Sequence, residues 1–148
     1  MNLAEILDPD RVCCDVVVAS KKRSLEEIAK LLALGALDID PSDILNGLAG
    51  REKLGSTGLG HGIAIPHTRM NGIETSTGAL IRLRHPIEYD SHDSQPVDMI
   101  FGLLVPQQAT GEHLQHLASI AEKFSDDEFC EKARAAADAA ALHALIAA

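Results

Sequence analysis

The sequence is poor in aromatic residues and in positive charge. Its 148 residues include no tryptophan, one tyrosine and three phenylalanines, and 22 acidic side chains outnumber 13 basic ones, which gives a formal net charge of −9. Nucleic-acid binding relies on basic surfaces and, for single strands, on aromatic rings that stack on bases. The composition therefore argues against nucleic acid as a partner. An acidic body instead suits a partner protein with a basic docking patch, unless the charge serves solubility alone.

Cysteines and long apolar segments are also scarce. Cys13, Cys14 and Cys130 are an odd number without C-x-x-C spacing, which indicates a reducing compartment and no disulfide framework. The first residues lack the basic start and apolar core of a secretory signal. The alanine-rich tail is too short to span a bilayer and is interrupted by an aspartate and a histidine. We therefore expect a cytoplasmic protein without membrane insertion.

Apolar periodicity predicts a mixture of strands and helices. Strands are expected over residues 12–19, 62–65, 75–83 and 97–105, with a polar connection over residues 84–95. Helix N-caps are expected at Ser24, which opens a capping box with Glu27, at Asp40 before Pro41 and at Thr110. Asp126 and Asp127 are expected to open a further helix, and Gly50 is expected to end the second helix. Two helices after the first strand and three after the last favour an α/β fold, a mixed sheet with helices on both faces, in one domain over residues 1–148.

The segment with the most chemical content covers residues 51–68 and reads R-E-K-L-G-S-T-G-L-G-H-G-I-A-I-P-H-T. Its glycines allow positive φ and a close approach of the backbone to a ligand. The short apolar run that follows is too short and too β-branched for a helix, so it is predicted to be a buried strand. Pro66 is expected to end that strand, which holds the side chain of His67 at the rim of the sheet.

Two other kinds of site are disfavoured by the same residues. The glycine loop lacks the Gly-Lys-Ser/Thr of a Walker A motif and the spacing of a dinucleotide fingerprint. A metal site could be drawn from four histidines, of which two share helical i, i+3 spacing: His61, His67, His113 and His116. No H-E-x-x-H motif or acidic third ligand accompanies them, so we expect neither a metal nor a cofactor. His116 is expected at the surface, and His61 could line the pocket of the loop.

Eight residues of this segment resemble the phosphorylation-site signature of enzyme IIA domains of the mannitol/fructose class, from the bacterial phosphoenolpyruvate-dependent phosphotransferase system. They are Glu52, Leu59, Gly60, Ile63, Ala64, Ile65, Pro66 and His67. Thr68 departs from the signature, which has a small residue at that position. The resemblance extends to residues 20–23, 95–101 and 113–115, and the lysine-rich turn is similar to the stand-alone nitrogen-regulatory subtype. It implies a three-layer α/β/α sandwich with a mixed β-sheet.

The resemblance also implies a function. His67 would be the phosphorylated nucleophile, which receives its phosphoryl group from an upstream histidine phosphocarrier protein. Downstream regulatory target proteins would then read the phosphorylation state. The alternative is a sugar-specific enzyme IIA that passes the phosphoryl group to a separate enzyme IIB for uptake of fructose or mannitol. Both functions need the same site, so the sequence leaves both open.

Four further residues are candidates for the surroundings of His67. Arg51 could present a planar fork to phosphoryl oxygens, or it could stabilise the C-terminus of its own helix. Ser56 and Thr57 could bind phosphate through their hydroxyl groups, or they could form a turn. By the resemblance, His113 is a second histidine of the site, which orients His67 or donates to the phosphoryl group. Glu52 would repel a phosphate, so a structural or solvent-facing role is expected for it.

Overall fold

The computed structural model describes residues 3–109 and 111–148, except for the side chains of Glu112 and His113. The strands are β1 (Val12–Val16), β2 (Gly58–Gly60), β3 (Ile63–Ala64), β4 (His67–Met70), β5 (Thr77–Ile87) and β6 (Val97–Pro106). The helices are α1 (Lys21–Leu34), α2 (Pro41–Lys53), α3 (Gly111–Phe124), α4 (Asp127–Ala135) and α5 (Ala139–Ala147). None of the described helices is long and apolar enough to cross a membrane.

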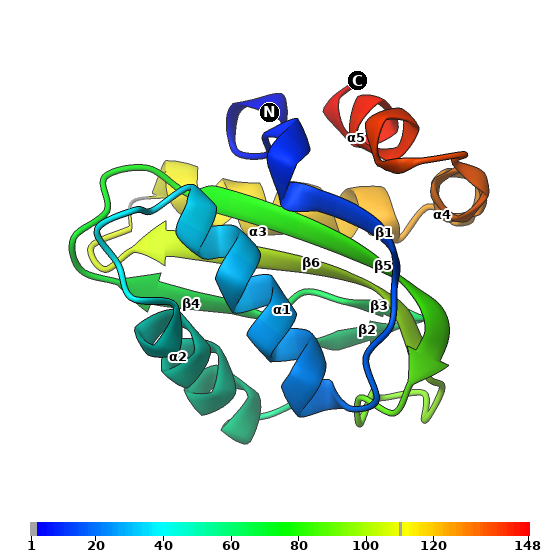
Figure 1. Cartoon of the computed structure of the whole chain (residues 1–148), viewed down its shortest axis with the longest axis horizontal. Coiled ribbons are helices and arrows are strands. Elements are labelled where there is room, and N and C mark those ends of the chain that lie inside the picture. The colour runs from blue at the N-terminus through cyan, green and yellow to red at the C-terminus, as the bar shows by residue number, and fades with distance from the viewer. Residues whose placement is uncertain (1–2, 110) are drawn as a thin grey trace.

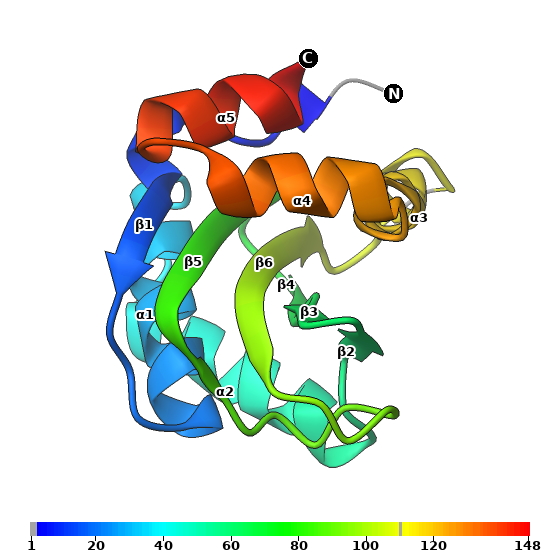
Figure 2. The same ribbon diagram turned by 90° about the vertical axis from the view of Figure 1, so that its right-hand side faces the viewer.

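The strands form one mixed six-stranded sheet in the order β1-β5-β6-β3-β2, and β4 also pairs with β6. β5 runs antiparallel to β6, whereas β3 and β4 run parallel to β6 and β1 runs parallel to β5. Helices α1 and α2 cover one face of the sheet, and α3, α4 and α5 lie over the other (Figures 1 and 2). The expected three-layer α/β/α sandwich with a mixed sheet is confirmed.

Each face of the sheet has its own apolar core. Neighbouring side chains of β5 alternate between them, so that Leu80 packs in the core under α3, α4 and α5 while Ile81 packs against α1 and α2. A strand that is buried on both faces appears in the sequence as a continuous apolar run. The two interior strands predicted over residues 75–83 and 97–105 are confirmed as β5 and β6 for this reason.

Helix α1 begins earlier than predicted. Its N-cap is Ser20, whose hydroxyl oxygen accepts a hydrogen bond from the backbone N–H of Arg23 at 3.2 Å. The expected cap, Ser24, is buried inside the helix and donates to the carbonyl oxygen of Lys21 at 2.6 Å. The prediction was wrong because both serines precede the same apolar pattern. The basic residues between them are good helix formers, so the first helical turn can include them.

The start of α2 was predicted correctly, and its end was not. Asp40 caps the helix by accepting a hydrogen bond from the N–H of Ser42 at 2.8 Å, and Asp126 caps α4 in the same way. Helix α2 continues through Gly50 to Lys53, because a single glycine weakens a helix without breaking it. The cap predicted at Thr110 lies outside the described residues.

The C-terminal ends of β1 and β5 also differ from the prediction. β1 stops at Val16, whereas β5 continues to Ile87 and so takes up the first part of the segment predicted as a polar connection. Arg84, His85 and Pro86 are exposed there, so no apolar alternation marks this end of β5 in the sequence. Just beyond it, Tyr89 is fully buried.

His67 begins a strand instead of following the last one. β3 comprises only Ile63 and Ala64, and the chain resumes its pairing with β6 as β4, where His67 lies opposite Leu103. Pro66 interrupts the strand as predicted, but its carbonyl oxygen still accepts a hydrogen bond from the N–H of Leu103 at 3.0 Å. Proline lacks only the donor, so the ladder along β6 continues past it.

Candidate active site

A cavity of about 340 Å³ lies beside His67. It is enclosed by the end of α2 and the loop after it, the beginning of β4, the connection between β5 and β6, and α3. Its lining residues are Arg51, Ser56, Thr57, Gly58, Leu59, Ile65, His67, His92, Leu117 and Ala121. The structure thus brings four of the five predicted site residues to one place.

The ring of His67 is held by a contact two residues back in the chain. Its Nδ1 lies 2.8 Å from the carbonyl oxygen of Ile65, and the side chain is half-buried. A carbonyl oxygen can only accept a hydrogen bond, so in the neutral ring the proton belongs on Nδ1. Nε2 is then the nitrogen that keeps its lone pair.

Thr68 turns away from the cavity. Successive side chains of a strand point to opposite faces, and Thr68 packs against α2, where a Cβ atom at Gly47 would lie 2.7 Å from the Thr68 hydroxyl oxygen. Glycine at position 47 therefore makes room for threonine after the histidine. Thr68, the departure from the signature, is accordingly not among the residues that line the cavity beside His67.

Arg51 occupies the last turn of α2 and reaches the loop beyond it. One guanidinium nitrogen, Nη1, donates a hydrogen bond to the carbonyl oxygen of Gly55 at 2.8 Å. A guanidinium group has five N–H donors, and this bond uses one of them. Arg51 therefore both closes the turn after its helix and lines the cavity with a positive charge.

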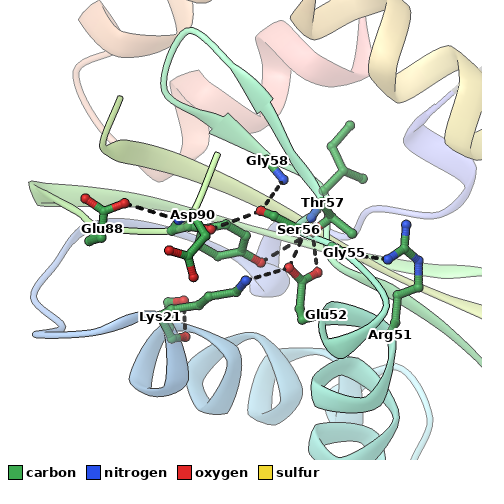
Figure 3. Close-up of polar contacts among 12 residues, drawn as sticks. Lys21, Arg51, Glu52, Gly55, Ser56, Thr57, Gly58, Glu88 and Asp90 are labelled. Carbon is green, nitrogen blue, oxygen red and sulfur yellow. Dashed lines mark hydrogen bonds and ion pairs between the residues drawn. The ribbon is translucent and has the colours of Figure 1, made fainter. Parts of the chain in front are cut away.

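The carboxylate of Glu52 is buried and fixes the loop from the opposite side (Figure 3). Its side chain is 5% exposed and pairs with the Lys21 ammonium of α1 at 3.0 Å. The same carboxylate accepts hydrogen bonds from the Thr57 backbone N–H, at 3.1 Å, and from the Thr57 hydroxyl. Of the two roles expected for Glu52, the contacts support the structural one, and its burial excludes a solvent-facing position.

The hydroxyl groups of Ser56 and Thr57 are bonded within the protein. Ser56 donates to the carbonyl oxygen of Tyr89 at 3.0 Å and accepts from the N–H of Gly58 at 3.1 Å. Because the proton of Thr57 points to Glu52, the phenol of Tyr89 donates to the Thr57 oxygen across 3.4 Å. These bonds form a turn, and the predicted contact of both hydroxyl groups with phosphate stays a prediction.

Burial raises the pKa of the Tyr89 phenol far above its ordinary value, and the nearby Glu52 charge raises it further. The ammonium of Lys21 also lies over this ring, 4.5 Å from its centroid. We call these four side chains, Lys21, Glu52, Thr57 and Tyr89, the Glu52 cluster. The cluster joins α1, the end of α2, the loop beside His67 and the connection after β5.

His92 lines the cavity and was missed by the sequence analysis. It is exposed on the connection after β5, which approaches the glycine loop so closely that a Cβ at Gly58 would collide with Ser91. Asp93 of the same connection accepts a hydrogen bond from the N–H of His61 at 2.9 Å. These long-range contacts place His92, and no local spacing in the sequence could have indicated them.

The remaining histidines are distributed differently from expectation. His61 lies beside Arg134 and Asp98, outside the lining of the His67 cavity. His116 is 6% exposed, so the expectation of a surface residue was wrong. His113 belongs to the first turn of α3, but its side chain lies outside the described residues and its predicted role stays a prediction. Within the described part of the chain, no three histidine, cysteine or acidic side chains could together hold a metal ion.

Comparison with known proteins identifies a family over nearly the whole chain. Residues 5–148 match the family described as phosphoenolpyruvate-dependent sugar phosphotransferase system, EIIA 2. A nitrogen regulatory protein of Pseudomonas aeruginosa is 42% identical over 146 residues, which cover 99% of this chain and 95% of that protein.

Solved structures show the same relationship. The nitrogen regulatory protein IIA-Ntr of Neisseria meningitidis has a TM-score of 0.92 and 44% identity, over 97% of this chain and 98% of that one. The mannitol IIA protein of Escherichia coli has a TM-score of 0.77 over 95% of this chain and 98% of that one, and at 17% identity it shows the fold alone. The chain therefore belongs to the EIIA 2 family of the phosphoenolpyruvate-dependent phosphotransferase system and is a phosphotransfer component.

Proposed function

We propose that His67 accepts a phosphoryl group on Nε2 from the phosphohistidine of an upstream carrier protein, and that the resulting state of the chain is a nitrogen-regulatory signal. The observation that carries the proposal is the 2.8 Å contact from His67 Nδ1 to the Ile65 carbonyl oxygen, which leaves Nε2 as the free nucleophile. Full-length similarity to proteins called nitrogen regulatory supports the regulatory part.

The transfer needs no group beyond the two histidines and their surroundings. The lone pair of Nε2 forms a new N–P bond while the N–P bond of the donor breaks, and the donor ring keeps the electron pair of that bond. Positive charge develops on the His67 ring, and the Ile65 carbonyl oxygen stabilises it through the Nδ1 proton. Arg51 offers charged donors to the phosphoryl oxygens at the moment of transfer.

Phosphorylation would change which proteins bind to the surface around the cavity. Leu59 lines the cavity and is 43% exposed, so it offers an apolar contact beside His67. A phosphoryl group adds a charge of about −2 to this surface. Target proteins that accept a neutral imidazole would be repelled by that charge, and targets with arginine or lysine at the same place would be favoured.

The test compares two carriers. The purified chain is mixed with phosphorylated carrier proteins of the nitrogen type and of the sugar type at equal concentrations, and the initial rate of label transfer to each histidine-bound product is measured. We expect faster transfer from the nitrogen-type carrier. Faster transfer from the sugar-type carrier would establish the alternative, a IIA protein that serves sugar uptake. No transfer from either would contradict the whole proposal.

A further inference from the structure

A second groove lies between α1 and α2, on the side of α2 away from His67. Its volume is about 480 Å³, which is larger than the 340 Å³ of the His67 cavity. Both volumes fall in the range of about 300 to 1,000 Å³ that is common for small-molecule sites. The lining residues are Lys21, Lys22, Leu25, Leu45, Asn46, Ala49, Glu52 and Lys53.

The lining combines an apolar floor with a positive rim. Leu25, Leu45 and Ala49 supply the floor, and Leu25 is buried while the other two are half-buried. Lysines from both helices surround it, although the chain as a whole has a formal net charge of −9. A local cluster of positive charge at a concave, largely apolar surface concentrates anions there. The chemistry of the lining therefore fits an anion with an aliphatic part.

The three lysines of the rim differ in how they are engaged. Lys21 is only 21% exposed and pairs with the buried Glu52 at 3.0 Å. Lys22 and Lys53 are exposed, and no ion pair within 4.0 Å is found for them among the described residues. An incoming carboxylate can therefore meet Lys22 and Lys53 directly, while it competes with Glu52 for Lys21.

The shape of the groove favours a small molecule over a protein surface. Flat docking faces expose large apolar side chains, and the most exposed leucines of this chain, Leu37 and Leu54, are not among the residues that line the groove. The apolar floor here lies between two helices, and the polar lining residues are the three lysines, Asn46 and the buried Glu52. That arrangement can enclose an aliphatic chain of modest length and leave its charged end at the rim.

We propose that this groove is a second binding site, which takes a small carboxylate with an aliphatic tail and whose occupancy opposes phosphorylation of His67. The coupling runs through the Glu52 cluster. A bound carboxylate draws Lys21 from Glu52, the residue that holds Thr57 in the wall of the His67 cavity (Figure 3). Two anions on opposite sides of the end of α2 also repel each other. Because linkage is reciprocal, phosphorylated chain binds the carboxylate more weakly by the same factor.

The binding test uses octanoate as the probe and does not depend on the proposed function. Amide NMR spectra of the unphosphorylated chain are recorded during titration with octanoate, octanol and acetate. We expect saturable shifts at Leu45, Asn46 and Ala49 for octanoate only, with a dissociation constant on the order of 1 mM. Shifts of equal size with octanol, or no saturable shifts with octanoate, would overturn the proposal.

Substitutions of the rim lysines test whether these residues bind the carboxylate of octanoate. The double substitution Lys22→Met and Lys53→Met should weaken octanoate binding at least about tenfold, as two lost charge contacts at a partly exposed rim imply. Lys30→Met is the control, because it removes one lysine charge from α1 outside the groove and should leave binding unchanged. Equal affinity in the double variant would overturn the assignment of the anion to the rim.

The coupling test rests on the proposed function. Saturating octanoate should shift the equilibrium of phosphoryl transfer about fivefold, away from phosphorylated His67 and toward the phosphorylated carrier, and phosphorylated chain should bind octanoate weaker by the same factor. Binding without any effect on transfer would refute the coupling. If the chain accepts no label even without octanoate, the proposed function has failed, and the binding titration still decides the site. Protection of Leu45 and Ala49 by the upstream carrier protein, with no octanoate binding, would assign the groove to a protein partner and overturn the proposal.

Discussion

The His67 cavity and the groove between α1 and α2 lie on opposite sides of the C-terminal end of α2. Three consecutive residues of that helix contribute to their walls. Arg51 lines the cavity, Lys53 lines the groove, and Glu52 between them is buried in contact with both walls. A helix turns by about 100° per residue, so three neighbours necessarily face three directions. One helical turn thus contributes one residue to the lining of the cavity, one to the lining of the groove and one buried carboxylate between them. The comparison predicts that substitution of Arg51 changes mainly transfer, whereas substitution of Glu52 changes mainly stability.

The largest effect is expected at His67. His67→Ala removes the nucleophile and should abolish acid-labile, base-stable phosphorylation, while the free energy of unfolding stays close to that of the unsubstituted chain, since the ring is only half-buried. Radiolabelling followed by acid and base treatment measures the first quantity, and urea unfolding measures the second. His85→Ala, on an exposed part of β5, is the matched control and should label fully. Equal labelling of the His67 variant would refute the assignment.

Glu52→Ala should have the second largest effect, on stability. It leaves the half-buried ammonium of Lys21 and the Thr57 donors without their acceptor, which costs on the order of 3 kcal/mol of the free energy of unfolding. Urea denaturation monitored by circular dichroism measures the change. Glu26→Ala breaks an exposed pair with Arg23 on α1 and should cost less than about 1 kcal/mol. A loss of the same size in both variants would show that the Glu52 cluster is no stronger than a surface pair.

Arg51→Ala should affect transfer more than stability. The variant loses a charge-assisted contact to the phosphoryl group, so the transfer rate should fall at least about tenfold, or about 1.4 kcal/mol in the activation free energy. Arg51→Lys should restore only part of the rate, because an ammonium cannot present a planar fork. Arg23→Ala is the control for removing an exposed arginine. Unchanged kinetics of transfer would reduce Arg51 to its bond with the Gly55 carbonyl oxygen.

The smallest effect concerns pH and Tyr89. Burial raises the pKa of the Tyr89 phenol in the folded chain above its unfolded value. Its contribution to stability is therefore complete below the unfolded pKa near 10 and decreases as the pH rises above it toward the folded pKa. The free energy of unfolding should fall by about 1 kcal/mol more between about pH 9 and pH 11 than it does in Tyr89→Phe.

The sequence contains one tyrosine, so phenolate absorbance reports Tyr89 alone. The absorbance of the folded chain should stay that of the neutral phenol through about pH 11. Titration of Tyr89 at the pH of an exposed phenol would contradict the burial on which the Glu52 cluster depends.

Local signals in the sequence predicted much of the fold. The apolar runs of β5 and β6 identified the centre of the sheet, and Asp40 and Asp126 marked helix starts through hydrogen bonds that span only a few residues. Ser24 shows the limit of such signals, because a cap and a buried serine one turn later look alike in one dimension.

The site was predictable where it is local and not where it is assembled from distant segments. Arg51 and His67 flank one glycine loop, so sequence could place them together. The pairing of Glu52 with Lys21 joins two helices, and His92 reaches the cavity only because Tyr89 and Asp93 are bonded to the loop. No periodicity encodes such contacts, since they depend on how the helices and the connection pack.

The nitrogen that carries the phosphoryl group tests the central claim most directly. The chain is phosphorylated with phosphoenolpyruvate and the upstream proteins, and phosphorus and nitrogen NMR spectra of the His67 ring are recorded. The contact from Nδ1 to the Ile65 carbonyl oxygen predicts phosphorus on Nε2, with the proton retained on Nδ1. Phosphorus on Nδ1, or on any residue other than His67, would contradict the account.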